Sequence, residues 1–265
     1  MTYFSEDNTS AGMAAERASL VPGTPMWGEH RARYQFAARF VEGRSVLDIA
    51  CGTGFGAGIL IEHGAERVFG ADFAAEALID ARNELPINTH LLRADGTMLP
   101  FPDNSIDVVT SFETVEHITD HSGFIAELAR VLKPDGRAVI STPNALYTKP
   151  VNGKPLNPFH LYEFTPTEYR DLLEPHFSSV ELLGQRVTTQ YRICPYFEKP
   201  EMLPRDLVSR IKTIGWKLGA RLPAPIRESA ARLVSGHTFY PGEHDFVFDA
   251  TELDVGYVQV AVCVK

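Results

Sequence analysis

The sequence predicts an α/β protein built on a doubly wound, mostly parallel sheet, and three observations support this fold class. Between residues 45 and 187, short apolar runs alternate with longer segments of helical periodicity, as in repeated strand–helix units. The first apolar run leads into a glycine-rich turn at residues 50–56. Acidic residues then stand at the ends of the predicted strands, where doubly wound sheets bind their ligands.

Length and composition narrow the class of protein. The 265 residues, 44% of them hydrophobic, suffice for one large α/β domain with an insertion. Because no apolar run has transmembrane length and residues 1–20 lack a signal-peptide pattern, we expect a soluble cytoplasmic protein. Cys51, Cys194 and Cys263 show no paired spacing, which indicates a reducing compartment. The net charge of −9 argues against a nucleic-acid partner.

The chain is expected to begin with an arm and a helix. Residues 1–28 are polar and rich in Ser, Gly, Pro and Ala, which predicts a flexible N-terminal arm before a domain over residues 29–265. Residues 29–40 place aromatic and small apolar side chains at helical spacing. This pattern predicts a helix that packs in the core; the alternative, a helix that lies beside the first strand and covers the ligand, is what the family resemblance given below implies.

The repeated units follow in order. Strands are predicted at residues 46–49, 67–71, 89–93, 105–110, 137–142, 179–187 and 256–265. Helices are predicted between the glycine turn and residue 63, and over residues 74–82, 124–132 and 166–176. Pro166 suits the first turn of the last helix, and Lys133-Pro-Asp-Gly136 suits a helix stop followed by a turn.

Residues 188–255 form a predicted insertion before the last strand, with helix-like runs at residues 205–221 and 226–234. Seven basic residues with few acids lie in these runs: Arg205, Arg210, Lys212, Lys217, Arg221, Arg227 and Arg232. Three interpretations stay open, namely a solvated face, a homodimer contact, and a lid over an acidic or lipid-linked substrate.

The glycine turn by itself fits two kinds of ligand. Gly52-x-Gly54-x-x-Ala57 matches a dinucleotide fingerprint, and glycines let the backbone approach a ligand closely. Asp48, inside the preceding strand, would repel a pyrophosphate but attract the cationic amino-acid end of S-adenosylmethionine. Residues 46–56 resemble motif I of the class I S-adenosylmethionine-dependent methyltransferases, with Ala50 where the family usually has its first glycine.

The resemblance covers residues 30–187 and the last strand. It implies a Rossmann-like sheet of seven strands in the order 3-2-1-4-5-7-6, with the last strand antiparallel. It also implies that S-adenosylmethionine is bound by Asp48, Ala50, Gly52, Gly54, Asp72, Phe73, Asp95, Gly96 and Phe112.

For two of these acids, Asp72 and Asp95, a role in binding the cofactor stands beside a purely structural alternative. Asp72 ends the second strand about 20 residues after the glycines, where an acid can accept both ribose hydroxyls, although it also suits a helix N-cap. The resemblance implies that Asp95 binds the adenine amino group and that residues 98–101 form a wall beside the base. The alternative is a simple turn whose apolar residues fill the core.

A second constellation follows the fourth strand. If a helix starts there, Glu113, Glu116 and His117 stand at i, i+3 and i+4 and share one face. Two carboxylates and an imidazole suit a divalent metal. The alternative is that the acids complement a helix dipole while the histidine is a hydrogen-bonded core residue.

A later motif extends this constellation. Asn157-Pro-Phe-His160 with Glu163 follows the fifth strand. Together the two stretches resemble the metal site of the small-RNA 3′-end 2′-O-methyltransferases, and Glu-x-x-Glu-His alone resembles the O-methyltransferases of ubiquinone biosynthesis. The resemblance implies that Glu113, Glu116, His117 and His160 bind Mg²⁺, or otherwise Mn²⁺ or Zn²⁺. His117 or His160 is then the expected catalytic base.

The motif His30-x-x-Arg33-Tyr34 with Asn-Pro-Phe-His is most like bacterial sugar and polysaccharide methyltransferases. We therefore expect a metal-assisted O-methyltransferase acting on a hydroxyl of a sugar, a glycan or another vicinal diol. The main alternative is a metal-independent O- or N-methyltransferase with His117 as general base. Catechol or RNA acceptors, a binding protein without catalysis, and a nicotinamide-dependent oxidoreductase are further alternatives.

Overall fold

The computed structural model describes residues 23–86, 89–192, 203 and 205–265. Most of the predicted N-terminal arm lies outside these residues. Helix α2 (Pro25–Ala37) begins four residues before the predicted start at residue 29, with Pro25 in its first turn. Within the described residues, none of the helices is long and apolar enough to cross a membrane.

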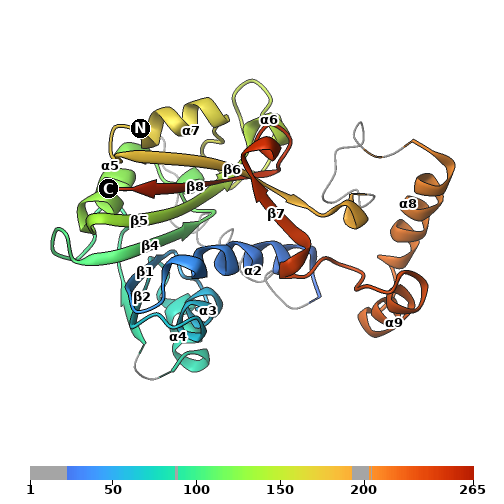
Figure 1. Cartoon of the computed structure of the whole chain (residues 1–265), viewed down its shortest axis with the longest axis horizontal. Coiled ribbons are helices and arrows are strands. Elements are labelled where there is room, and N and C mark those ends of the chain that lie inside the picture. The colour runs from blue at the N-terminus through green and yellow to red at the C-terminus, as the bar shows by residue number, and fades with distance from the viewer. Residues whose placement is uncertain (1–22, 87–88, 193–202, 204) are drawn as a thin grey trace.

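The α/β class is confirmed, and the structure is a single twisted sheet with helices on both faces (Figure 1). The strands are β1 (Ser45–Ile49), β2 (Arg67–Asp72), β3 (His90–Arg93), β4 (Ile106–Phe112), β5 (Leu132–Pro143), β6 (Ser179–Val187), β7 (Phe246–Asp249) and β8 (Val258–Val264). Their order is β3-β2-β1-β4-β5-β8-β6-β7. The first five strands pair in parallel, and β8 runs antiparallel to both β5 and β6.

The prediction of seven strands is wrong, because the described sheet has eight. The additional strand, β7, comes from the predicted insertion and pairs antiparallel with β6 at the sheet edge, with Arg186 opposite Val247. Its four residues are too short a run to stand out by alternation alone. Part of the predicted insertion, residues 246–249, therefore belongs to the sheet.

The other helices are α3 (Phe55–Glu62), α4 (Ala75–Glu84), α5 (His121–Val131), α6 (Ala145–Thr148), α7 (Pro166–Leu173), α8 (Leu207–Gly219) and α9 (Ala224–Ser235). A reciprocal capping box between Thr165 and Glu168 starts α7 as a local sequence signal would predict. The predicted helix stop at residues 133–136 is displaced, since α5 ends at Val131 and β5 begins at once with Leu132.

Two apolar clusters cover the two faces of the sheet. One packs α5 and α7 against the strands through Phe124, Leu128 and Tyr169, all fully buried. The other packs α2, α3 and α4 against the opposite face through residues such as Tyr34 and Leu60. Because both faces are covered, the central strands are apolar on both sides.

Helices α8 and α9 lie beyond the β7 edge of the sheet, at the right of Figure 1. Trp216 of α8 stacks on Phe239, with ring centroids 5.4 Å apart and planes within 14°. Farther along, the returning chain packs closely on α2, where a Cβ added to Gly28 would stand 2.1 Å from the Pro241 carbonyl oxygen. This contact requires glycine at position 28.

Candidate active site

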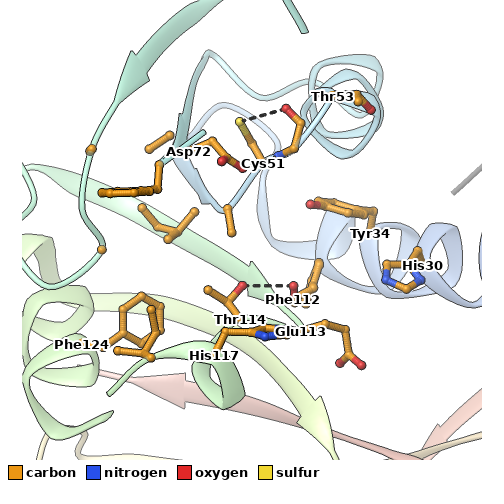
Figure 2. Close-up of a pocket in the computed structure, with 18 of the residues that line it drawn as sticks. His30, Tyr34, Cys51, Thr53, Asp72, Phe112, Glu113, Thr114, His117 and Phe124 are labelled. Atoms are coloured by element: carbon orange, nitrogen blue, oxygen red, sulfur yellow. Dashed lines mark hydrogen bonds between the residues drawn. The ribbon is translucent and has the colours of Figure 1, made fainter. Parts of the chain in front are cut away.

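A cavity of about 300 Å³ opens at the carboxyl ends of β1, β2 and β4, between the sheet and α2 (Figure 2). In a doubly wound sheet this is the place where the strand order reverses and ligands bind. Nine of the predicted site residues line it, namely Ala50, Gly52, Asp72, Phe73, Gly96, Phe112, Glu113, His117 and His160. Asp48, Gly54, Asp95 and Glu116 are not among the lining residues.

The turn between β1 and α3 has the left-handed backbone that its glycines permit. Gly52 and Gly54 have φ of +54° and +83°, and a Cβ on Gly54 would lie 2.6 Å from Leu85 Cδ1. Ala50 also adopts positive φ, at +57°, so the turn forms despite the missing first glycine. Gly56 has a packing role, since a Cβ there would stand 1.9 Å from Tyr34 Cζ.

Asp48 lies beneath the cavity, fully buried. Its Oδ1 accepts hydrogen bonds from Thr110 Oγ1 at 2.7 Å and from Tyr34 Oη at 3.1 Å. Burial raises the pKa of Asp48 to about 7, against the lowering effect of these two hydrogen bonds. Asp48 thus holds Tyr34, which lines the cavity, and its direct contact with the cationic end of the cofactor stays a prediction.

Asp72 combines the two roles that the sequence left open. Its Oδ2 accepts from the Gly52 N–H at 2.9 Å, and its Oδ1 accepts from the Ala74 N–H at 2.8 Å at the start of α4. The carboxylate thus ties the glycine turn to the next strand and still lines the cavity. Phe73 follows it at the cavity, with 61% of its surface exposed and available for contact with a ligand.

Asp95 sits in an exposed turn instead of in the cavity wall. Its Oδ1 accepts from the Thr97 N–H at 2.9 Å and from Thr97 Oγ1 at 2.8 Å. These local bonds match the turn that was the alternative explanation. Gly96 does line the cavity, and a Cβ there would meet the Phe124 ring at 2.5 Å.

The condition on which Glu113, Glu116 and His117 would share a helix face is not met. Strand β4 continues to Phe112, Glu113 then takes φ of +51°, and only residues 115–117 form a single 3₁₀ turn. Glu113 accepts a hydrogen bond at Oε1 from Ser141 Oγ at 2.7 Å, on β5. A non-glycine residue held in left-handed conformation is a strained position of the kind found at functional sites.

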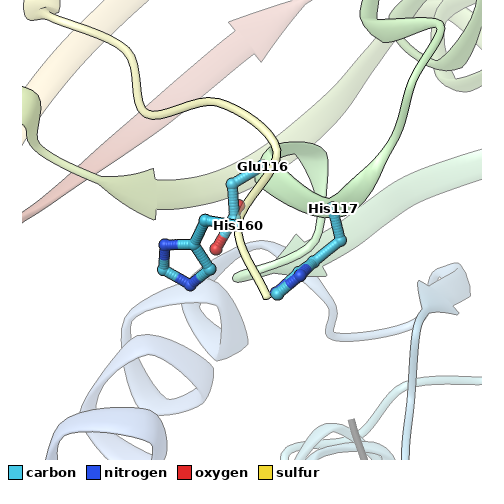
Figure 3. Close-up of side chains that lie close together, drawn as sticks. All are labelled: Glu116, His117 and His160. Carbon is cyan, nitrogen blue, oxygen red and sulfur yellow. The ribbon is translucent and has the colours of Figure 1, made fainter. Parts of the chain in front are cut away.

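Three of the four predicted metal ligands nevertheless converge. One ligand atom each of Glu116, His117 and His160 lies within 4.8 Å of the others. Figure 3 shows the three side chains close together. The two histidine rings meet edge to face, with centroids 4.9 Å apart. The Leu161 N–H donates to the Glu116 carbonyl at 2.8 Å and so fastens the His160 loop over the 3₁₀ turn. Glu113 is not part of this cluster.

Neighbouring groups orient both imidazoles. His117 Nδ1 lies 3.0 Å from the Phe159 carbonyl, and His160 Nδ1 lies 2.6 Å from Glu163 Oε1. Each Nδ1 therefore carries the hydrogen, and the lone pair is on Nε2, which in His160 faces the Asn157 amide at 2.8 Å. Although burial alone would raise it, hydrogen bonds from His160 and Thr148 lower the pKa of Glu163.

Helix α2 supplies site residues whose roles the sequence did not assign. Glu29 and His30 line the cavity together with Tyr34. Burial raises the pKa of Glu29 to about 8 in spite of the nearby Arg33 guanidinium. The pKa of His30 is lowered, mainly by burial and to a smaller extent by the positive charge of Arg33. The motif His-x-x-Arg-Tyr marked this helix, but nothing in its spacing indicated which side chains face the cavity.

Comparisons with known proteins show similarity to methyltransferases. Residues 47–140 match the family model described as a methyltransferase domain. Over this stretch the chain is similar to S-adenosylmethionine-dependent methyltransferases.

Two relatives by sequence illustrate how far the methyltransferase likeness extends. A Mycolicibacterium smegmatis protein named as a probable S-adenosylmethionine-dependent methyltransferase is 39% identical over 152 residues, covering 57% of this chain and 58% of that protein. A ubiquinone biosynthesis O-methyltransferase of Neisseria meningitidis is 35% identical over 108 residues, covering 38% of this chain and 45% of the relative. The chain thus spans about half the length of the curated relatives it matches.

The methyltransferase fold also matches solved structures over nearly the whole chain. One is a chain from the Haloferax volcanii complex of the Trm112 methyltransferase activator with a methyltransferase. It has a TM-score of 0.60 and 19% identity, and the match covers 98% of this chain and 97% of that one. At this identity the likeness shows the fold alone.

Proposed function

We propose that this protein is an S-adenosylmethionine-dependent O-methyltransferase that methylates a hydroxyl of a sugar or another vicinal diol with help from a divalent metal. The cluster of Glu116, His117 and His160 carries the proposal, because two of its members line the same cavity as the glycine turn. A methyl donor at the turn and an acceptor at the cluster would therefore share one cavity.

The donor chemistry of the cluster fits a divalent ion. Two imidazoles and a carboxylate form a familiar ligand set for transition metals, and their ligand atoms already lie within 4.8 Å of one another. Both histidines have their Nδ1 positions fixed by oxygen acceptors, the arrangement that orients metal-binding imidazoles. With Glu113 outside the cluster, the nitrogen-rich set favours Mn²⁺ or Zn²⁺ over Mg²⁺.

When bound, such an ion would act as a Lewis acid toward an acceptor hydroxyl. The chain's own residues do the rest. Asp72 offers carboxylate oxygens to the ribose hydroxyls of the cofactor, while the ring of Phe112 helps to enclose the cavity. If only one of the two imidazoles holds the metal, Nε2 of the other, His117 or His160, accepts the hydroxyl proton.

The relatives support the O-methyl part of the proposal only by analogy. The Neisseria protein is named as an O-methyltransferase of ubiquinone biosynthesis, and its likeness to this chain extends over 108 residues. A catechol acceptor is for that reason part of the substrate panel, beside sugars and short RNA.

The second candidate is a metal-independent methyltransferase with His117 as the general base. It is favoured by the position of His117, which lines the cavity with its Nδ1 fixed by the Phe159 carbonyl and its Nε2 able to accept a proton. Glu116, in contrast, is fully buried and does not line the cavity.

Calorimetric titration of Mn²⁺, Zn²⁺ and Mg²⁺ into the protein saturated with S-adenosylhomocysteine separates the two candidates. Binding that is lost in Glu116→Gln but kept in Glu113→Gln supports a metal at the cluster. Activity that a chelator abolishes and Mn²⁺ restores supports its use. A flat titration, with and without a diol acceptor, together with full activity in chelator contradicts the metal and leaves the His117 mechanism. His117→Ala at an unchanged rate contradicts that mechanism as well.

A further inference from the structure

Helices α8 and α9 carry a charge opposite to that of the rest of the protein. Residues 205–235 contain seven Arg and Lys residues against Asp206 and Glu228, a formal charge of +5. The whole chain has −9, so all other residues together carry −14. A segment so unlike its own protein in charge is suited to an anionic partner.

An apolar stripe runs along the same segment. Leu207, Ile211, Ile214 and Leu218 follow one another at helical spacing on a single face of α8, each between 58% and 72% exposed. Trp216 occupies the opposite face and stacks on Phe239. The inner face of α8 is therefore already packed against its own chain, and the apolar stripe points away from it.

Basic residues border this stripe on one side. Arg210 and Lys217 lie along that side, whereas Lys212 lies nearer the face of Trp216. On α9, Ile226, Ala230 and Leu233 line a shallow apolar hollow, and Leu233 is among the most exposed large apolar residues described. An outward apolar stripe flanked by Lys and Arg is the composition of helices that lie in a membrane–water interface.

We propose that α8 and α9 bind the protein to the surface of an anionic phospholipid bilayer, with the stripe in the acyl boundary and the flanking cations at the headgroups. The proposal goes beyond the methyl-transfer function and does not depend on it. The helices would lie on the bilayer, since none of the described helices is able to cross it.

Charge favours this occupant over a second copy of the chain. In a symmetric dimer through the stripe, the basic borders of two α8 helices would face each other, and like charges placed together oppose association. Anionic headgroups neutralise the same borders instead.

Co-sedimentation of the full chain with vesicles tests the proposal. We expect binding to vesicles of equal parts phosphatidylglycerol and phosphatidylcholine, weakening at high salt, and little binding to phosphatidylcholine alone. Both Ile211→Ser/Leu218→Ser and Arg210→Glu/Lys217→Glu should lower the partition coefficient by about tenfold or more.

Matched controls keep the test specific. Ile79→Ser removes an equally exposed isoleucine from α4, and Arg67→Glu reverses an exposed charge on β2; both should bind vesicles as the wild type does. S-adenosylhomocysteine binding should be unchanged in every variant, which shows that each is folded. Absence of vesicle binding, or equal binding to neutral vesicles, overturns the proposal. A dimer in light scattering that Ile211→Ser/Leu218→Ser dissociates also overturns it, because the stripe is then a self-association face.

Discussion

Asp48 makes the stability of the protein depend on pH in a direction that one substitution can isolate. The carboxyl group is fully buried, and its pKa is raised from the usual 3.8 to about 7. The folded state therefore binds this proton more tightly than the unfolded chain does. Stability is accordingly lost as the pH rises from about 4 to about 7, and the loss is complete above the folded pKa.

The size of the effect follows from the two pKa values. At about 1.4 kcal/mol for each pKa unit, ionised Asp48 lowers the free energy of unfolding by on the order of 4 kcal/mol above the folded pKa. Between pH 5 and pH 8 the loss amounts to about 2–3 kcal/mol, because the unfolded Asp is already ionised near pH 5. Asp48→Asn keeps an oxygen acceptor for Tyr34 and Thr110 and removes the ionisation.

Urea denaturation at the two pH values measures the difference. We expect the wild type to lose about 2–3 kcal/mol more stability than Asp48→Asn between pH 5 and pH 8. Asp107→Asn is the control. Although burial opposes it, hydrogen bonds from Ser45 and Lys133 lower the pKa of Asp107 to about 2, so it stays ionised throughout. Equal pH dependence in the wild type and Asp48→Asn would refute the reasoning.

Three further predictions concern the turn and the cluster. Ala50→Gly should raise the free energy of unfolding by up to about 1 kcal/mol in urea denaturation, because it relieves a left-handed alanine; a loss would contradict the strain. Gly56→Ala should cost about 2–3 kcal/mol and weaken S-adenosylhomocysteine binding in calorimetry by displacing Tyr34, whereas Gly58→Ala, whose Cβ has room, should do neither. Glu163→Gln should weaken metal binding about 10- to 100-fold at constant cofactor affinity; unchanged metal affinity would exclude Glu163 as an orienting group.

The sequence predicted the sheet well where apolar runs are long, and β6 has the predicted limits, residues 179 and 187. It failed at β7, whose pairing depends on β6 more than on its own four residues. At residues 113–117 it left the local structure open, because acids spaced for a helix face occur equally in a turn that tertiary contacts impose, here through Ser141.

The sequence located the motifs of the candidate site better than the burial of their side chains. Glycine and histidine motifs located the turn and the cluster, since their spacing reflects local backbone needs. A sequence motif does not specify which of its side chains are buried. The sequence therefore did not predict that Asp48 lies buried beneath the cavity or that Asp95 lies in a turn outside it. The cavity face of α2, with Glu29 and His30, depends on how that helix rotates against the sheet.

The segment that contains α8 and α9 begins and ends at neighbouring positions beside the sheet. The chain leaves the sheet after Val187 and returns at Asp245, where the Thr188 N–H donates to the Asp245 carbonyl at 2.8 Å and Gln190 Nε2 donates to its carboxylate at 2.9 Å. Because the two ends of this segment, at residues 188–190 and at Asp245, are hydrogen-bonded to each other, we expect that a short linker can replace the residues between them without a change in strand order. If α8 and α9 bind a bilayer as proposed, the residues that locate the protein and the residues that line the cavity lie in separate parts of one chain.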